Sequence, residues 1–226
     1  MARLEECVLY RDFFEQEQVL FPMTHLMNRQ AAKDMDPEES KKLFHESAHG
    51  LIELAGSYGF SGNLWQNYLT FLLISQENAF SLACERTGLP KGSICEAARN
   101  DFAIFKELYD YDLETFDKFS SGSYGKFLMN YQNACGRSKF FHKHMQERIG
   151  ELSQKLANTS DADAFMQEIA AFYREFGVGN LGLHKAFRIG RGEKGQVEIR
   201  PITNLAPVHL EDLVGYEAAK KKLVEN

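Results

Sequence analysis

Three residues of the sequence have the types and spacing of a metal-dependent hydrolytic site, since His45, Glu46 and His49 match the pattern H-E-x-x-H. On a helix, histidines four residues apart point in the same direction and can bind one zinc ion. The glutamate between them can act as a base for a zinc-bound water. These residues therefore indicate a zinc-dependent hydrolase as one candidate function.

The surrounding sequence explains the same residues without a metal. On a helical wheel the apolar side chains form one stripe, with His45 at its border: Phe44, Ala48, Leu51 and Ala55. The opposite side is polar and carries Lys42, Glu46, His49 and Glu53. Glu53 and Glu77 are candidates for a third ligand, but neither lies in a local metal-binding motif. The favoured interpretation is a solvated charged face with no metal bound.

A second motif, Gly177-Val-Gly-Asn-Leu-Gly182, matches the pattern G-x-G-x-x-G. In dinucleotide-binding folds this loop follows a strand and opens a helix, so that the helix N-terminus meets the pyrophosphate. Here a predicted helix precedes the glycines and a predicted strand follows them. The reversed order favours a glycine-rich hinge, which could lie against a following module and relay its movement.

Length and charge limit the classes of function. The chain has 226 residues, a length that corresponds to one large domain or to one domain plus a linker. Its net charge of −6 gives no general attraction to nucleic acid. One basic cluster runs from Arg137 to Arg148. A solvated helix face explains it better than a nucleic-acid site, because no aromatic and basic recognition motif surrounds it. A helical scaffold or nucleic-acid-binding module stays as a further alternative.

The cysteines and the longest apolar run favour a cytoplasmic protein that is not embedded in a membrane. The four cysteines are scattered without any C-x-x-C spacing, and they are Cys7, Cys84, Cys95 and Cys135. Such cysteines are typical of reduced thiols in a cytosolic protein. The longest apolar run, residues 69–74, is interrupted by Thr70 and is far too short to span a bilayer.

Hydrophobic periodicity and capping signals predict a series of helices. Asp36 followed by Pro37 marks one start, and residues 93–96 have the pattern of a capping box at another. The segment from Asn63 is apolar around much of its circumference, as in a helix at the centre of a bundle. The expected helices span residues 4–20, 25–32, 36–54, 63–86, 93–109, 112–119 and 126–157, with a kink at Gly136, and run from Asp161 or Asp163 to Phe176.

The pattern changes after this last helix from a helical period to the period of a strand. Residues 186–189 and 196–200 alternate between apolar and polar, and a glycine-rich stretch separates them, which predicts a β-hairpin. The sequence therefore predicts a mainly α protein, a multi-helix bundle with a small C-terminal β-hairpin and a linker helix. The expected division is a helical domain over residues 1–176, then hinge, hairpin and linker over residues 177–226.

The last quarter of the sequence resembles a known family. Residues 210–217 read Leu-Glu-Asp-Leu-Val-Gly-Tyr-Glu and lead into a lysine-rich segment, and residues 173–188 and 200–202 lie upstream of it. Together they are similar to an uncharacterised bacterial family of AAA+ ATPases. In that family a Walker A loop follows this segment by about one strand. The present sequence contains no G-x-x-x-x-G-K-[ST] pattern.

The resemblance implies that the chain is the N-terminal region of an AAA+ ATPase, cut just before the Walker A core. It implies a non-catalytic domain that binds a protein partner or substrate, or controls assembly, while the core binds ATP and Mg²⁺ and supports any oligomer. AAA+ proteins enclose the adenine with the segment that matches Val214, Gly215 and Tyr216. These are the expected cofactor contacts when the core is present, and residues 216–226 are the expected linker helix that docks on it.

Overall fold

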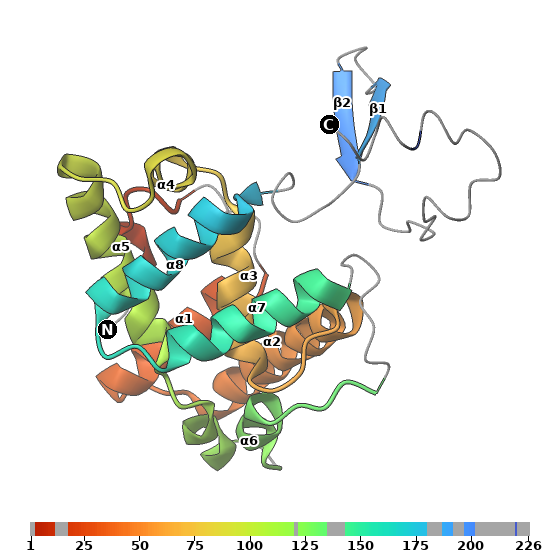
Figure 1. Ribbon diagram of the computed structural model, residues 1–226. Coiled ribbons are helices and arrows are strands. Elements are labelled where there is room, and N and C mark those ends of the chain that lie inside the picture. The colour runs from red at the N-terminus through yellow and green to blue at the C-terminus, as the bar shows by residue number, and fades with distance from the viewer. Residues whose placement is uncertain are drawn as a thin grey trace. The chain divides into compact units, whose positions relative to one another are not determined.

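Local caps and apolar stripes divide the chain into short helices, which Figure 1 shows in order along the chain. The computed structural model describes residues 3–11, 18–119, 122–134, 143–179, 187–191, 197–201 and 220. They belong to two units, Met1–Lys185 and Ala186–Asn226. The fold is mainly α, a multi-helix bundle with a small β-hairpin, so the predicted fold class is confirmed.

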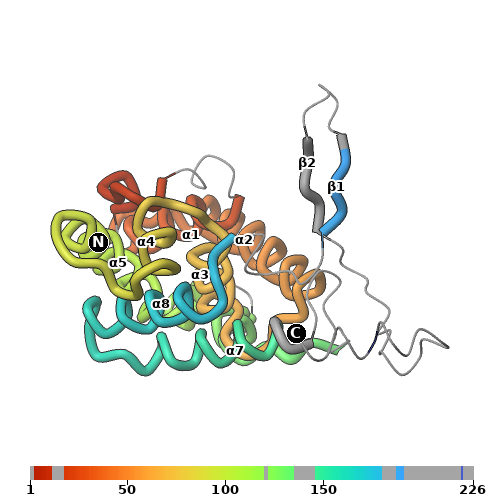
Figure 2. Tube along the Cα trace, turned by 45° about the horizontal axis from the view of Figure 1, so that its top comes forward, coloured from red at the N-terminus to blue at the C-terminus, as the bar shows by residue number. Residues whose placement is uncertain are grey.

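The helical unit combines α-helices with two short 3-10 helices. In chain order its elements are η1 (Leu4–Glu6), α1 (Leu20–Ala32), α2 (Pro37–Tyr58), α3 (Leu64–Ser75), α4 (Ala79–Thr87), α5 (Ser93–Tyr109), η2 (Leu113–Lys118), α6 (Tyr124–Met129), α7 (Lys143–Ala157) and α8 (Ala162–Phe176). α7 and α8 lie side by side in Figures 1 and 2, and α8 also contacts α4 and α5. α3 contacts α2, α5, α6 and α7, which places it at the centre.

α2 begins where its capping signals predict. The carboxylate of Asp36 accepts the backbone N–H groups of Glu38 and Glu39, both at 3.0 Å, and Pro37 is the first helical residue. Gly59 ends the helix with a φ of 76°, which a glycine adopts without strain. The predicted core stripe is confirmed, since Phe44, Ala48, Leu51 and Ala55 are all buried.

α3 is buried on nearly every side, as its apolar circumference predicts. Seven of its hydrophobic side chains are at most 1% exposed: Leu64, Trp65, Tyr68, Leu69, Leu72, Leu73 and Ile74. The indole Nε1 of Trp65 donates to the carbonyl oxygen of Leu108 (2.7 Å), and Gln66 Nε2 donates to that of Tyr109 (3.0 Å). The last carbonyls of a helix lack intrahelical donors, so these bonds satisfy the C-terminus of α5.

The prediction of one helix over residues 63–86 is wrong, because residues 76–78 separate α3 from α4. The side-chain oxygen of Asn78 accepts the N–H groups of Phe80 and Ser81 at 2.9 and 3.0 Å. The Ser81 hydroxyl in turn accepts the Asn78 N–H at 2.9 Å. This reciprocal cap starts a new helix inside a continuous apolar pattern. α5, by contrast, has its predicted bounds, but its N-cap is Gly92 and makes no side-chain cap hydrogen bond.

The prediction of a helix over residues 4–20 is wrong for residues 4–11 and 18–19, which are described and are not α-helical. Residues 4–6 form a single 3-10 turn, and residues 8–10 form bends. The next helix, α1, starts at Leu20 and contains Pro22 in its first turn. A proline is tolerated there because the first backbone N–H groups of a helix have no intrahelical partner. Pro22 therefore helps to start α1 instead of ending an earlier helix.

The prediction of a long helix over residues 126–157 is wrong as well. α6 spans only Tyr124–Met129, and after it Tyr131 pairs with Gly62 in an antiparallel bridge. A Cβ added at Gly125 would lie 2.1 Å from the carbonyl oxygen of Leu113, so only glycine lets α6 pack this closely on η2. α7 begins at Lys143, and the expected kink at residue 136 lies outside the described residues.

α8 is confirmed, with Asp161 accepting the N–H of Ala164 at 2.8 Å and Gly177 ending the helix. The cap lowers the pKa of the Asp161 carboxyl, because the backbone N–H of Ala164 stabilises its charged form. The neighbouring Ser160 hydroxyl also donates to this carboxylate.

Packing continues beyond the expected boundary between residues 176 and 177. Val178 is 2% exposed, and its N–H donates to a carboxylate oxygen of Glu85 in α4 at 2.6 Å. A Cβ added at Gly179, whose φ is 67°, would lie 2.5 Å from a carboxylate oxygen of Glu77. The first part of the expected hinge is thus held against the helical unit, which extends to Lys185.

The second unit contains the predicted β-hairpin. β1 (Phe187–Arg191) and β2 (Val197–Pro201) pair antiparallel, with Ile189 opposite Ile199. Of the expected linker helix only Lys220 is described, and its backbone is helical. In the described part of the chain, no helix has both the length and the apolar character needed to cross a membrane.

Candidate functional site: a groove between α1 and α2

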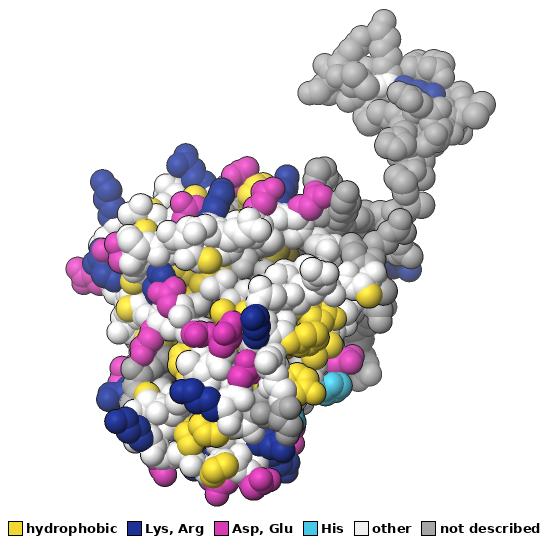
Figure 3. All heavy atoms as spheres, turned by 90° about the horizontal axis from the view of Figure 1, so that it is seen from below, with side chains coloured by type: hydrophobic (Ala, Val, Ile, Leu, Met, Phe, Trp, Pro, Cys, Tyr) yellow, Lys and Arg dark blue, Asp and Glu magenta, His cyan; other side chains and the backbone are white. Residues whose placement is uncertain are grey.

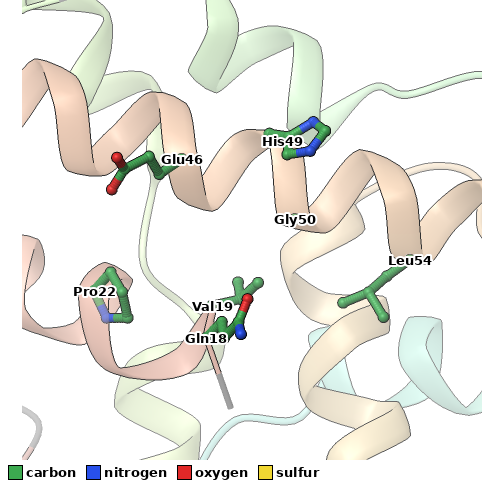
Figure 4. Close-up of a pocket in the computed structure, with 7 residues that line it drawn as sticks. All are labelled: Gln18, Val19, Pro22, Glu46, His49, Gly50 and Leu54. Carbon is green, nitrogen blue, oxygen red and sulfur yellow. The ribbon is translucent and has the colours of Figure 1, made fainter.

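An open hollow of about 570 Å³ lies between the start of α1 and the middle of α2. We call it the α1–α2 groove, and it is lined by Gln18, Val19, Pro22, Glu46, His49, Gly50 and Leu54. Figure 4 shows the first three residues at the start of α1 and the other four along α2. The groove therefore includes two of the three residues of the H-E-x-x-H motif.

A close approach of the two helices forms the floor of the groove. A Cβ added at Gly50 would lie 2.6 Å from Cγ2 of Val19, so the absence of a side chain at residue 50 allows this contact. Glycine inside a helix costs about 1 kcal/mol relative to alanine. Gly50, a glycine inside a predicted helix, is therefore the sequence signal for this close approach, in addition to the H-E-x-x-H motif.

The rim of the groove is polar and exposed. Glu46 forms an ion pair with Lys42 at 3.9 Å, and these two side chains are 60% and 76% exposed. Glu53 is also exposed and lies two helical turns from Glu46, on the same side of α2. Exposed pairs of this kind contribute about 0–1 kcal/mol, so Glu46 can exchange Lys42 for another cation at little cost.

His45 is separated from the groove by its packing. Its ring lies 5.3 Å from the ring of Tyr124 in α6, at an interplanar angle of 67°. The Nε2 atom of His45 is buried and has no hydrogen-bond partner among the described residues. His45 therefore faces α6, whereas Glu46 and His49 face the groove beside α1.

Within the described ranges, no group of three or more His, Cys, Asp or Glu side chains is arranged to hold a metal ion. The two candidate third ligands lie elsewhere. Glu53 is exposed on α2, and Glu77 lies next to Gly179 beside α4. A zinc site needs three protein ligands around one point. The described side chains thus supply at most part of the ligand set that the motif suggested.

The other sequence candidates fall largely outside the described residues. Of the basic cluster only Arg148 has a described side chain, and its guanidinium lies 4.1 Å from the ring centroid of Phe176 in α8. Of the glycine motif, residues 177–179 are described and pack on the helical unit. The expected adenine contacts, Val214, Gly215 and Tyr216, lie outside the described part of the chain.

Two buried tyrosines in the core form their hydrogen bonds within the protein. The hydroxyl of Tyr173 donates to the carbonyl oxygen of Leu73 at 2.6 Å and lies 2.9 Å from the hydroxyl of Tyr10. Because the single proton of Tyr173 is used, Tyr10 is the donor between them. Burial raises the pKa of both hydroxyls, so they stay neutral. These tyrosines tie α8 to α3 and to the N-terminal segment.

A buried carboxylate anchors the same N-terminal segment. Asp101 in α5 is fully buried and accepts the backbone N–H groups of Val8, Leu9 and Tyr10 at 2.8, 2.7 and 3.1 Å. Successive N–H groups that converge on an anion form a backbone nest. Asp101 thus has a structural explanation, and it replaces the helix that the sequence predicted here.

The buried cysteines have a packing role. Cys7 and Cys84 are fully buried free thiols, and burial raises the pKa of the Cys84 thiol to about 12. A thiol with so high a pKa is a poor nucleophile at neutral pH. Cys95 is only half-buried, and Cys135 lies outside the described residues.

The surface of the helical unit carries both signs of charge. Figure 3 shows acidic and basic side chains interspersed on one face, with small hydrophobic groups between them and one such group beside a histidine. On the face that Figure 3 draws, the described side chains form no continuous basic stripe of the kind that binds nucleic acid.

No protein-family model matches the chain, and no match is found among curated proteins or solved structures. The described geometry and the sequence resemblance are therefore the basis of the functional argument.

Proposed function

We propose that this chain is a non-catalytic interaction and regulatory domain of an AAA+ ATPase. The α1–α2 groove is the single observation that carries the proposal, because it combines apolar lining with exposed polar groups that have only weak partners. Asp101 and Tyr173, by contrast, are buried in the core and form their hydrogen bonds within the protein. A surface with this contrast is suited to binding another protein.

The AAA+ assignment is supported by the resemblance of residues 173–188, 200–202 and 208–226. In this proposal an AAA+ core is the domain's intramolecular partner, binds ATP and Mg²⁺, and supports oligomer formation. Val214, Gly215 and Tyr216 contact the adenine when that core is present. In this proposal the protein is cytoplasmic, a location that its scattered cysteines favour.

The natural protein provides the test. An antibody against this chain isolates it from its native cells, and mass spectrometry reads the sequence that follows Asn226. We expect a Walker A loop about one strand downstream, and Mg²⁺-dependent ATP hydrolysis. Tyr216→Ala in that protein should weaken ATP binding about five- to hundredfold, by analogy with the roughly 1–3 kcal/mol of base stacking on aromatic rings.

The isolated chain is the matching control. Residues 1–226 should show no tight ATP binding by calorimetry, because the backbone N–H groups and lysine of a phosphate loop are missing. Micromolar ATP affinity of this chain, or a natural protein without a Walker A loop, would refute the AAA+ assignment.

A further inference from the structure

We infer that the α1–α2 groove binds a short segment of a partner protein in which apolar side chains are flanked by lysine or arginine. The inference rests on the proposed interaction function and adds the chemistry of the partner. It follows from the floor of the groove, from its rim and from the charge of the unit that carries it.

The floor selects apolar side chains. Val19, Pro22 and Leu54 line the hollow, and the close approach of Val19 to Gly50 forms its floor. A volume of about 570 Å³ lies within the roughly 300–1,000 Å³ of pockets that bury small ligands. An extended chain can place one or two aliphatic side chains in such a space, while its backbone stays at the mouth.

The rim selects cations. Glu46 and Glu53 stand on one side of α2, two turns apart, and both are exposed. Lys42 is the described counter-ion of Glu46, at 3.9 Å. An arriving lysine or arginine can take its place, because a long and exposed ion pair is weak. A cation beside the apolar segment would meet Glu46, which lines the groove, and a second cation further along α2 would meet Glu53 outside it.

The charge of the whole unit favours the same partner. Residues 1–185 contain 26 acidic and 19 basic side chains, an excess of seven negative charges. The resulting field attracts a basic segment and repels nucleic acid, an acidic peptide or a second copy of the unit. A basic and apolar peptide is therefore the occupant that floor, rim and net charge share.

An array of short immobilised peptides tests the inference with the whole chain carrying a fluorescent label. Each probe has Leu, Ile, Val, Met or Phe at two central positions, with Lys or Arg at the flanks. The matched probes have Glu at the flanks, or Ser at the centre. We expect the basic and apolar probes to retain about tenfold more protein than either matched set.

Variants then place the binding in the groove. In titrations of the best probe, Leu54→Arg should weaken binding by about tenfold or more, because it fills the floor and adds a positive charge. Glu46→Lys should weaken it about three- to tenfold, and its exposed position keeps the fold intact. The matched control is Glu151→Lys on the exposed side of α7, which should change affinity by less than about twofold.

Four results would overturn the inference. Equal weakening by Glu46→Lys and Glu151→Lys would mean general charge attraction. Binding that neither groove variant changes would place the site elsewhere. Acidic probes that bind in the groove would overturn the chemistry and leave an interaction role standing. No retention of any probe would remove the groove as a peptide site, while the AAA+ assignment keeps its separate test on the natural protein.

Discussion

The buried tyrosine pair and the α1–α2 groove use polar groups in opposite ways. The hydroxyls of Tyr10 and Tyr173 and the carbonyl oxygen of Leu73 form one closed chain of hydrogen bonds inside the core. In the groove, Glu46 has a single described counter-ion at 3.9 Å, and its side chain is more than half exposed. The comparison teaches that the core polar groups hold helices together, whereas those of the groove can change partners without unfolding the protein.

The largest expected effect concerns the apolar part of the core. Leu72→Ala should lower the free energy of unfolding by about 2–5 kcal/mol, because it opens a cavity in α3, where Leu72 is 1% exposed. Urea denaturation measures this change. The matched control is Leu82→Ala in α4, where the side chain is 39% exposed and the cost should stay below about 1 kcal/mol. Equal costs at the two positions would contradict the assignment of α3 to the centre.

A second test removes the buried carboxylate. Asp101→Asn should cost about 1–3 kcal/mol, since an amide cannot accept all three N–H groups of Val8, Leu9 and Tyr10 as the carboxylate does. Hydrogen exchange should also speed up at these three amides. Unchanged exchange there would show that Asp101 does not hold the N-terminal segment.

A third test removes the hydroxyl of Tyr173, which connects Tyr10 to the carbonyl oxygen of Leu73. Tyr173→Phe should cost about 1–2 kcal/mol, because the carbonyl of Leu73 and the hydroxyl of Tyr10 each lose a partner inside the core. Tyr124→Phe is the control, because that residue is 45% exposed and water can replace its contacts. Thermal unfolding curves that shift equally for both variants would argue against a structural role for the buried pair.

The smallest expected effect is in the groove. His49→Ala should change the free energy of unfolding by less than about 0.5 kcal/mol, because the side chain is exposed on α2. The same variant tests the metal alternative. Elemental analysis after purification with zinc should find well under one zinc per chain. Stoichiometric zinc that disappears in both His45→Ala and His49→Ala would restore the hydrolase hypothesis. The groove would then hold a fixed metal ligand instead of polar groups that can change partners.

Patterns that depend on neighbouring residues were predictable. The side chains of Asp36 and Asp161 cap α2 and α8 by accepting backbone N–H groups two or three residues further along the chain. Such short-range contacts can be predicted from the sequence. The amphipathic face of α2 was likewise predictable, because burial of Phe44 and exposure of His49 follow from helical period alone. The hairpin follows from alternation in the same way.

Errors arose where a distant or competing contact decided the structure. The amide of Asn78 divided an apolar run into two helices, and Asp101 drew the N-terminal segment out of a helical pattern. Tyr131 left the helical path to pair with Gly62. Each of these contacts offers backbone groups a partner other than the helix, which local propensity does not reveal.

The sequence by itself determined the helical class, most helix caps, the core face of α2 and the net negative charge, because these depend on residue type and short-range spacing. Only the tertiary structure decided that His45 turns to Tyr124 while Glu46 and His49 face α1, and that Gly50 admits Val19. A five-residue motif defines directions along one helix. The residues that face that helix depend on how the chain packs, so the tertiary structure divides the motif between an aromatic contact with α6 and an open groove beside α1.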